Sequence, residues 1–287
     1  MENHLVKPSI LSTPVERRGL KPANSAQNLS VDDLAVEEPL EIRIEFGPTS
    51  KRERKSISIT MRTPGHDFEL AVGFLFTEGL IQSKSQIQNV EFCGPSGNVV
   101  RVDLTEHTTF DMKKLERHFY TTSSCGVCGK ASIEALRTVA PEKIHGTEDF
   151  SLAEELIHAL PQKLRAQQGI FDTTGGLHAC ALFDLRGNII ASREDVGRHN
   201  ALDKLIGFCL LQGKIPLNEN ILLVSGRASF ELVQKASMAQ IPIFAAVGAP
   251  SSLALELAQE QGMTLLGFVR EERFNIYNRH EKVRFST

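Results

Sequence analysis

Residues 221–269 read ILLVSGRASFELVQKASMAQIPIFAAVGAPSSLALELAQEQGMTLLGFV, and this stretch decides the fold. Its short apolar runs at 221–224, 243–247 and 264–269 are typical of buried strands. Amphipathic segments begin at Ala228 and at Ser251, and Gly262 suits the end of the second helix. Strands that alternate with helices predict a mixed or parallel sheet with helices on both faces.

The chain before this stretch is predicted to form a second, smaller unit. Alternating apolar positions at 41–46 and 56–61 indicate two neighbouring strands, a helix follows Pro64 and Gly65, and more strands are expected at 89–92 and 99–104. The capping-box pattern Ser151-Leu-Ala-Glu154 opens a helix that Pro161 is expected to end or bend.

These patterns together predict an α/β (α+β) protein. We expect a smaller N-terminal α/β subdomain at 36–118 and a C-terminal domain at 151–287, whose mixed sheet is flanked by helices. Residues 119–150 are expected to hold a cysteine loop and a connecting helix. Residues 1–35, rich in Pro, Ser and Asn, are predicted to be a mobile tail.

Composition and charge exclude several classes of protein. The 287 residues include 32 basic and 35 acidic side chains, so a net charge of −3 gives no global field for nucleic acid or an anionic membrane. No apolar run approaches the roughly 18 residues of a membrane span, and the first 35 residues lack a signal-peptide core. We expect a cytoplasmic protein with no nucleic-acid or membrane partner, whose five cysteines stay reduced.

The segment Cys125-Gly-Val-Cys128 is the one close pair of cysteines in the chain. It joins a polar loop to a predicted helix, whose N-terminal N–H groups and dipole favour the thiolate. A structural zinc site would need four ligands, and no second C-x-x-C or H-x-x-x-H pair exists. A thioredoxin-type site would need a strand leading straight into the helix, whereas here a loop rich in Thr and Ser precedes Cys125. Cys180 and Cys209 are predicted to pack in the core, and Cys93 to end a strand.

Two loops, at 225–229 and 248–252, follow predicted strands and open predicted helices. Each combines a glycine, a hydroxyl group and a helix N-terminus, features that bind phosphate. Taken singly, each is more often only a well-capped helix. Together at one edge of an open α/β sheet, they predict a nucleotide-like ligand. The candidate ligand-binding residues are Ser225, Gly226, Arg227 and Ser229 in the first loop, and Gly248 and Ala249 in the second.

A dense polar cluster at 194–200 lies between a predicted strand and a predicted helix at 201–211. On one interpretation, Asp195 or Asn200 caps this helix and His199 finds a partner within the fold. On the other, Arg198 and His199 face the ligand beside the two loops. The segment 268–273, which leaves the last strand, adds two arginines near the same edge.

Several segments, in order, resemble the formate dehydrogenase accessory sulfurtransferase family, FdhD. They are RTPGHDFELAVGFLFTEG at 62–79, TTSSCGVCG at 121–129, GGLHACALFD at 175–184, EDVGRHNALDK at 194–204, SGRASFE at 225–231, and GFVR and FNIY near the end. The likeness runs from about residue 40 to 280, and the ordered set is far more specific than any single segment.

The resemblance implies a homodimeric sulfurtransferase with a persulfide intermediate. Such a protein receives sulfur from a cysteine desulfurase and delivers it to the bis(guanine dinucleotide) molybdenum cofactor, Mo-bis(molybdopterin guanine dinucleotide), of formate dehydrogenase. On the family pattern Cys125 carries the persulfide, and our hypothesis is that Cys128 shares the sulfur or resolves the product as a disulfide. The family's cofactor-binding segment corresponds to Phe268, Val269, Arg270, Glu271, Glu272 and Arg273.

The family's C-terminal region is also similar to the cytidine deaminase fold. The deaminase zinc motifs H-x-E and P-C-x-x-C are missing, and residues 194–200 and 225–229 fill their places. We therefore expect no zinc and no deamination, but a retained pocket for the guanine nucleotide end of the molybdenum cofactor.

The alternative function is a non-catalytic chaperone that binds the molybdenum cofactor, with a C-x-x-C segment that is merely structural. A carrier needs a thiol that reaches two partners, so we expect the loop at 121–128 to be mobile, helped by a glycine after each cysteine. A persulfide loaded by a desulfurase would separate the two functions.

Overall fold

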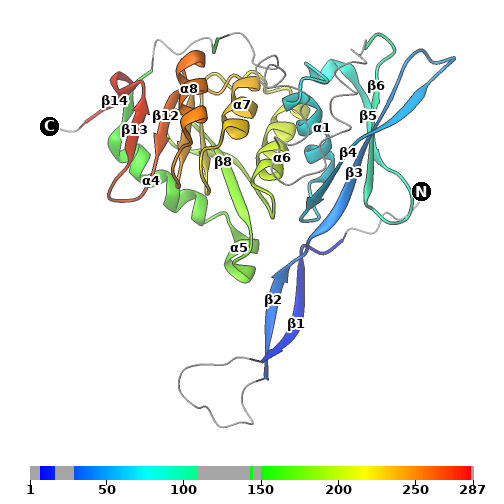
Figure 1. Cartoon of the computed structure of the whole chain (residues 1–287), viewed down its shortest axis with the longest axis horizontal. Helices are drawn as coiled ribbons and strands as arrows, with labels where there is room; N and C mark the ends of the chain where they lie inside the picture. The colour runs from blue at the N-terminus through cyan, green and yellow to red at the C-terminus, as the bar shows by residue number, and fades with distance from the viewer. Residues whose placement is uncertain (1–6, 17–28, 109–142, 145–149, 286–287) are drawn as a thin grey trace.

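The computed structural model describes residues 7–16, 29–108, 143–144 and 150–285. Its largest element is a six-stranded sheet in the order β13-β12-β11-β10-β8-β9 (Figure 1). β10, β11 and β12 run parallel, whereas β8, β9 and β13 run antiparallel to their neighbours, so the predicted mixed sheet is confirmed. The strands are β8 (His178–Asp184), β9 (Ile189–Asp195), β10 (Asn220–Val224), β11 (Ile243–Ala246), β12 (Thr264–Gly267) and β13 (Asn275–Asn278).

Helices cover both faces of this sheet, as predicted. Leu222 of β10 packs in one core with α6 (Arg198–Leu211), α7 (Phe230–Met238) and α8 (Ser252–Gln261). The next residue, Leu223, packs on the opposite face with Leu160 of α4 (Glu154–Arg165). Because successive side chains of a strand point to opposite faces, a strand buried on both sides is apolar throughout, which explains the run at 221–224.

The N-terminal part forms a four-stranded sheet in the order β4-β3-β6-β5. Leu40, Ile42 and Ile44 of β3 are buried against α1 (Asp67–Thr77), and the residues between them are charged. Such alternation marks a sheet with one buried face, and it confirms the predicted strands. The strands are β3 (Glu38–Phe46), β4 (Glu53–Arg62), β5 (Ile87–Phe92), which a 3-10 turn at Lys84–Gln86 precedes, and β6 (Val99–Leu104).

Two glycines join the two sheets into one core. A Cβ atom added to Gly73 of α1 would lie 1.8 Å from the Asp203 carbonyl oxygen, and one added to Gly207 of α6 would lie 1.9 Å from the Glu69 carbonyl oxygen. The two helices therefore cross backbone to backbone, which only glycine permits. Apolar residues from both sheets consequently belong to one hydrophobic cluster.

A two-stranded ribbon, which we call the arm, projects away from both sheets (Figure 1). It pairs β1 (Ile10–Glu16) antiparallel with β2 (Leu29–Ala35). The prediction of a tail over 1–35 does not anticipate these strands. The register places Leu11 opposite Leu34 and Pro14 opposite Val31, on opposite faces, so no single alternating face marks the strands in the sequence.

Other local predictions differ from the structure around α4. The helix begins at Glu154, after an N-cap at Ala153 rather than at the predicted Ser151. Of the two outcomes expected at Pro161, it does not end there; it continues to Arg165. A proline inside a helix costs about 3 kcal/mol, yet Ile157, Leu160 and Leu164 bury one face of α4 on the sheet and outweigh that cost. Helix α5 (Gly169–Thr174) and the pair β7 (Leu152–Ala153) and β14 (Val283–Arg284), which follows a 3-10 turn at His280–Lys282, are not predicted.

Several predictions fall outside the described residues. Cys125, Cys128, the loop at 121–128 and the helix expected after it all lie in residues 109–142. The similarity of the six-stranded sheet to the cytidine deaminase fold stays a prediction. Among the helices that the structure describes, none is long and apolar enough to cross a membrane.

Candidate ligand-binding site

The ends of several strands meet at one edge of the six-stranded sheet. The parallel strands β10, β11 and β12 all end there. His178, the first residue of β8, pairs with Asp195, the last residue of β9, and Gly267 at the end of β12 pairs with Asn275 at the start of β13. The loops at 225–229, 248–252 and 268–273 therefore gather at this edge, where open α/β sheets bind ligands.

Backbone hydrogen bonds join these three loops, at 225–229, 248–252 and 268–273, into one surface that we call the ledge. The Gly248 N–H donates to the Gly226 carbonyl oxygen at 2.8 Å, and the Ala228 N–H donates to the Ala249 carbonyl oxygen at 3.1 Å. The Phe268 N–H in turn donates to the Gly248 carbonyl oxygen at 3.0 Å. A Cβ atom on Gly248 would lie 3.0 Å from the Gly226 oxygen, so the close approach favours glycine. The structure thus brings the predicted loops together.

A pocket of about 650 Å³ opens beside this ledge. Its volume lies within the range of about 300–1,000 Å³ that is usual for small-molecule sites. Of the predicted site residues, Ser225 and Glu271 line it, whereas Gly226, Arg227, Gly248 and Ala249 belong to the ledge. The full lining is Pro161, Gln162, Leu164, Arg165, Gln168, Phe171, Gly175, Gly176, Leu177, His178, Ser225, Val247 and Glu271.

Phe171 of α5 forms an aromatic wall of the pocket. The Glu194 carboxylate accepts hydrogen bonds from the Ile170 and Phe171 N–H groups, at 3.2 and 2.9 Å, and so anchors the start of α5. The Arg165 guanidinium lies 4.5 Å from the centre of the Phe171 ring and also pairs with Asp172 at 2.6 Å. An aromatic ring with a cation against one face can stack with the planar base of a nucleotide on the other.

His178 is a pocket residue that the sequence interpretation missed. Its imidazole is half-buried, and burial together with the positive groups of Arg198 and His199 holds its pKa below the usual value. The ring is therefore neutral at pH 7, with one nitrogen donating and the other accepting. The only sign in the sequence is a polar residue that precedes the apolar run at 179–183.

Ser225 combines a structural contact with a free donor. Its Oγ accepts a hydrogen bond from the Ala179 N–H at 2.9 Å, while its backbone N–H donates to the Ala179 carbonyl oxygen at 2.9 Å. These bonds fix the start of the loop against β8. A hydroxyl that accepts still has its own proton, so Ser225 can donate it to a ligand in the pocket.

Asp195 has a structural role, but it does not cap α6, whose N-cap residue is Gly197 with no side-chain hydrogen bond. Its carboxylate is fully buried and lies 2.7 Å from the Lys204 ammonium. It also accepts hydrogen bonds from the Thr63 N–H at 3.2 Å, the Gly197 N–H at 2.8 Å and the Asn200 side-chain amide at 3.0 Å. Asp195 thus fixes the start of α6 to the N-terminal subdomain.

Arg198 and His199 are not among the residues that line the pocket. The His199 Nε2 is 3.3 Å from the Glu231 carboxylate, at the start of α7, and the pKa of Glu231 is lowered chiefly by this contact. The Arg198 Nε is buried with no hydrogen-bond partner in the described part of the chain. Arg198 and His199 both lower the pKa of His178 electrostatically.

The segment Phe268–Arg273 is a turn whose residues face different ways. Phe268 has a φ of 52°, a left-handed conformation that is uncommon outside glycine, and Val269 is fully buried in the core. The side chains of Arg270, Glu271, Glu272 and Arg273 are exposed. The Arg270 N–H donates to the Arg273 carbonyl oxygen at 2.8 Å, which closes the turn.

Two of the three described cysteines are not candidates for sulfur transfer. Cys180 and Cys209 are buried, which confirms the prediction that they pack in the core. Burial raises the pKa of both thiols, that of Cys209 to about 11, so neither is a thiolate at pH 7. Cys93 is half-buried. In the ranges that the structure covers, no group of three or more His, Cys, Asp or Glu side chains could hold a metal ion.

Comparison with known proteins finds relatives that span nearly the whole chain. The sequence profile of the FdhD/NarQ family matches residues 35–284. Sulfur carrier protein FdhD of Streptomyces avermitilis is 49% identical over 268 residues, which are 91% of this chain and 92% of that protein. Sulfur carrier protein FdhD of Sulfolobus acidocaldarius is 42% identical over 254 residues, 88% of this chain and 92% of that protein.

The fold also has a solved counterpart. A crystal structure of a formate dehydrogenase accessory protein from Desulfotalea psychrophila matches with a TM-score of 0.71 and 23% sequence identity. The match covers 96% of this chain and 100% of that one. The overall fold is therefore one that experiment has observed.

Proposed function

The chain belongs to the FdhD/NarQ family, and from this membership we propose that it is a cytoplasmic sulfur carrier that serves formate dehydrogenase. The observation that carries the proposal is the 42–49% identity, over about nine-tenths of the chain, to proteins named sulfur carrier protein FdhD. The sequence adds the close pair of cysteines that a carrier needs.

The carrier chemistry rests on Cys125 and Cys128. The Cys125 thiolate attacks the outer sulfur of a persulfide on a cysteine desulfurase; the donor's S–S bond breaks, the donor leaves as a thiolate, and Cys125 becomes the persulfide. In the delivery step, the Cys128 thiolate attacks the Cys125 sulfur and expels the outer sulfur as sulfide, which passes to the molybdenum of the acceptor. The two thiolates supply the two electrons and remain as a disulfide, which a dithiol reductant reopens.

The acceptor is a substrate, the bis(guanine dinucleotide) molybdenum cofactor, and its nucleotide end suits the pocket. Phe171 offers a stacking face, and the neutral His178 and the hydroxyl of Ser225 offer hydrogen bonds. The ledge adds the N-termini of α7 and α8, which favour phosphate, together with the exposed cation Arg227. The protein is proposed to act as a homodimer.

The alternative, a cofactor chaperone with structural cysteines, uses the same pocket but forms no persulfide. The two functions separate when the protein is incubated with a cysteine desulfurase and cysteine, and intact masses are measured. We expect one added sulfur atom on the wild type and on Cys128→Ala, and none on Cys125→Ala. Loading of Cys125→Ala but not of Cys128→Ala would reverse the two roles, and no loading of any form would leave the chaperone.

A further inference from the structure

One wall of the ligand pocket is a turn of exposed residues. Glu271 of this turn lines the pocket, and the side chains from Arg270 to Arg273 are all exposed. Backbone hydrogen bonds from Phe268 and Val269 fix the start of the turn, and the bond from Arg270 to Arg273 closes it. Because a side chain is only as well placed as the backbone that carries it, the contacts that hold this turn decide what the wall can recognise.

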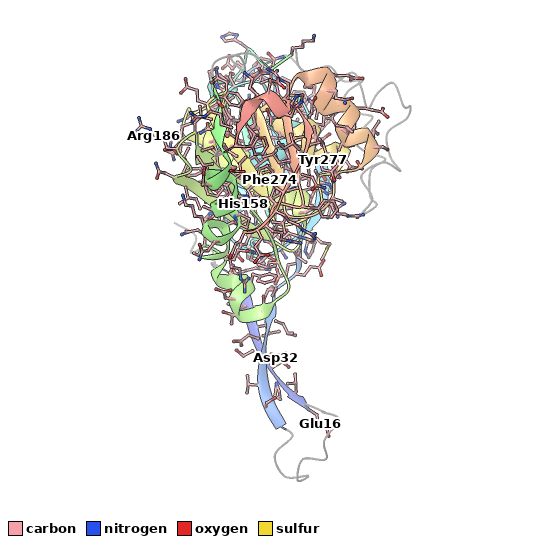
Figure 2. All side chains as sticks on the ribbon, turned by 90° about the vertical axis from the view of Figure 1, so that its left-hand side faces the viewer. Glu16, Asp32, His158, Arg186, Phe274 and Tyr277 are labelled. Carbon is pink, nitrogen blue, oxygen red and sulfur yellow. The ribbon has the colours of Figure 1, made fainter. Side chains whose placement is uncertain are left out.

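His158 of α4 contacts the turn on both sides of Glu271. Its Nδ1 lies 3.0 Å from the Arg270 carbonyl oxygen, and because a carbonyl oxygen only accepts, Nδ1 carries the proton and donates. Its ring packs edge-on against the Phe274 ring, with 5.0 Å between the ring centres and 61° between the planes. Figure 2 shows His158 and Phe274 side by side. His158 thus holds the short stretch of backbone that carries Glu271.

Helix α4 gives this contact a firm support. Three of its residues line the pocket and follow His158 by three, four and seven positions, namely Pro161, Gln162 and Arg165. This spacing places them on the same face of the helix as His158. At the far end of that face, Arg165 lies against the ring of Phe171. The buried residues of α4 fix it on the sheet, so one helix holds both the aromatic wall and the turn.

Glu271 is the one carboxylate among the described residues that line the pocket. A carboxylate only accepts hydrogen bonds, whereas the glutamine side chains of the lining both donate and accept. The Watson–Crick edge of guanine presents two neighbouring donors, the ring N1–H and the 2-amino group. Adenine presents an acceptor, the ring N1, beside its 6-amino group, and a carboxylate repels that acceptor. A fixed carboxylate therefore selects guanine over adenine.

We propose that His158 is the positioning residue that holds Glu271 at the pocket wall, where the carboxylate selects the guanine base. The inference rests on the proposed function, which takes the nucleotide end of the cofactor into this pocket. His158 is not among the residues that line the pocket, and it acts through the backbone of the turn. Loss of its hydrogen bond releases the Arg270 carbonyl and with it Glu271, while Phe171 and Ser225 stay in place.

Calorimetric titration with GDP and with ADP tests this role, because only GDP uses the Glu271 carboxylate. His158→Phe keeps a ring against Phe274 and removes the donor. It should weaken binding of GDP by about 3- to 10-fold, the range for one hydrogen bond, and leave binding of ADP unchanged. Glu271→Gln replaces one acceptor by a donor. It should weaken binding of GDP by about 10- to 100-fold, the range for hydrogen bonds to a charged group, and likewise spare ADP.

His158→Asn is the rescue variant, because its side-chain amide can donate from nearly the position of the imidazole Nδ1. It should bind GDP more tightly than His158→Phe does and approach the wild type. His280→Phe is the matched control at a histidine outside the pocket, whose side chain is 89% exposed. It should change neither affinity, and circular dichroism should show all variants folded.

Four results would overturn the proposal. Wild-type affinity for GDP in His158→Phe would remove His158 from the site. Equal losses for GDP and ADP in that variant would mean that His158 supports the pocket as a whole and does not act through Glu271. A wild type that binds GDP and ADP equally would overturn the selection of guanine. A wild type that binds neither would remove the nucleotide pocket itself, and sulfur loading by a desulfurase would then still test the carrier function separately.

Discussion

Replacing Asp195 by Asn should destabilise the fold by about 3–5 kcal/mol, because breaking a buried ion pair leaves the other charge uncompensated. Lys204 is only 1% exposed, and its ammonium lies 2.7 Å from the Asp195 carboxylate. Without that carboxylate it keeps two carbonyl oxygens, those of Thr63 at 2.8 Å and Glu194 at 3.4 Å. Neutral acceptors at these distances cannot replace a full negative charge.

The reverse change, Lys204→Met, should cost less, about 1–3 kcal/mol. The Asp195 carboxylate keeps hydrogen bonds from the Thr63 and Gly197 N–H groups and from the Asn200 amide. In the double variant neither charge remains, so its loss should be smaller than the sum of the two single losses, with a coupling of about 0.5–3 kcal/mol.

Equilibrium unfolding in urea at pH 7 measures all three changes. Arg43→Met is the matched control, because it breaks the partly exposed pair of Arg43 with Glu41, worth about 0–1 kcal/mol. A loss for Asp195→Asn as small as that of the control would refute the structural role of Asp195. Strictly additive losses would refute the coupling of the pair.

Three further predictions concern the site and its scaffold. Arg227→Ala should weaken binding of GDP by about 1.5–3 kcal/mol, the range of a hydrogen bond to a charged group, and equal binding in calorimetry would remove Arg227 from the site. Gly207→Ala should destabilise the fold by at least about 1–3 kcal/mol, because its Cβ would overlap the opposite helix, and an unchanged urea midpoint would contradict the close crossing. The pKa of His178, followed by NMR, should lie below the usual value and rise in Arg198→Ala, because a nearby positive charge disfavours protonation; an unchanged pKa would show that Arg198 does not act on it.

The sequence predicts the fold wherever burial leaves a local pattern. The uniformly apolar run at 221–224 and the alternating run at 41–46 differ because one strand is covered on both faces and the other on one. The arm escapes prediction because its apolar residues lie on both faces of an isolated ribbon. Whether Pro161 ends or bends α4 stays open in the sequence, because the packing on the sheet that lets the helix continue leaves no local pattern.

The candidate site likewise has parts that the sequence predicts and parts that it does not. The loops that contain Ser225 and Gly248 are predictable, because a glycine and a hydroxyl group between a strand and a helix form a local motif. The walls of the pocket are not predictable from the sequence. Phe171 and His178 come from segments far from those loops in the chain, and they meet the loops only through sheet pairing. For Asp195, the sequence suggests a helix cap, whereas the structure shows a buried ion pair with Lys204, a distant residue that no local pattern identifies.

Transfer of sulfur from a preloaded protein tests the central claim most directly. The wild type is loaded with isotopically labelled sulfur, freed of desulfurase, and mixed with the bis(guanine dinucleotide) molybdenum cofactor. The label on both protein and cofactor is then followed by mass spectrometry. We expect the label to leave Cys125 only when the cofactor is present, and to leave more slowly when excess GDP competes for the pocket or when Arg227 is replaced by Ala. A label that stays on the protein in the presence of the cofactor would contradict the carrier function, and transfer indifferent to both GDP and Arg227→Ala would contradict the pocket as the acceptor's site.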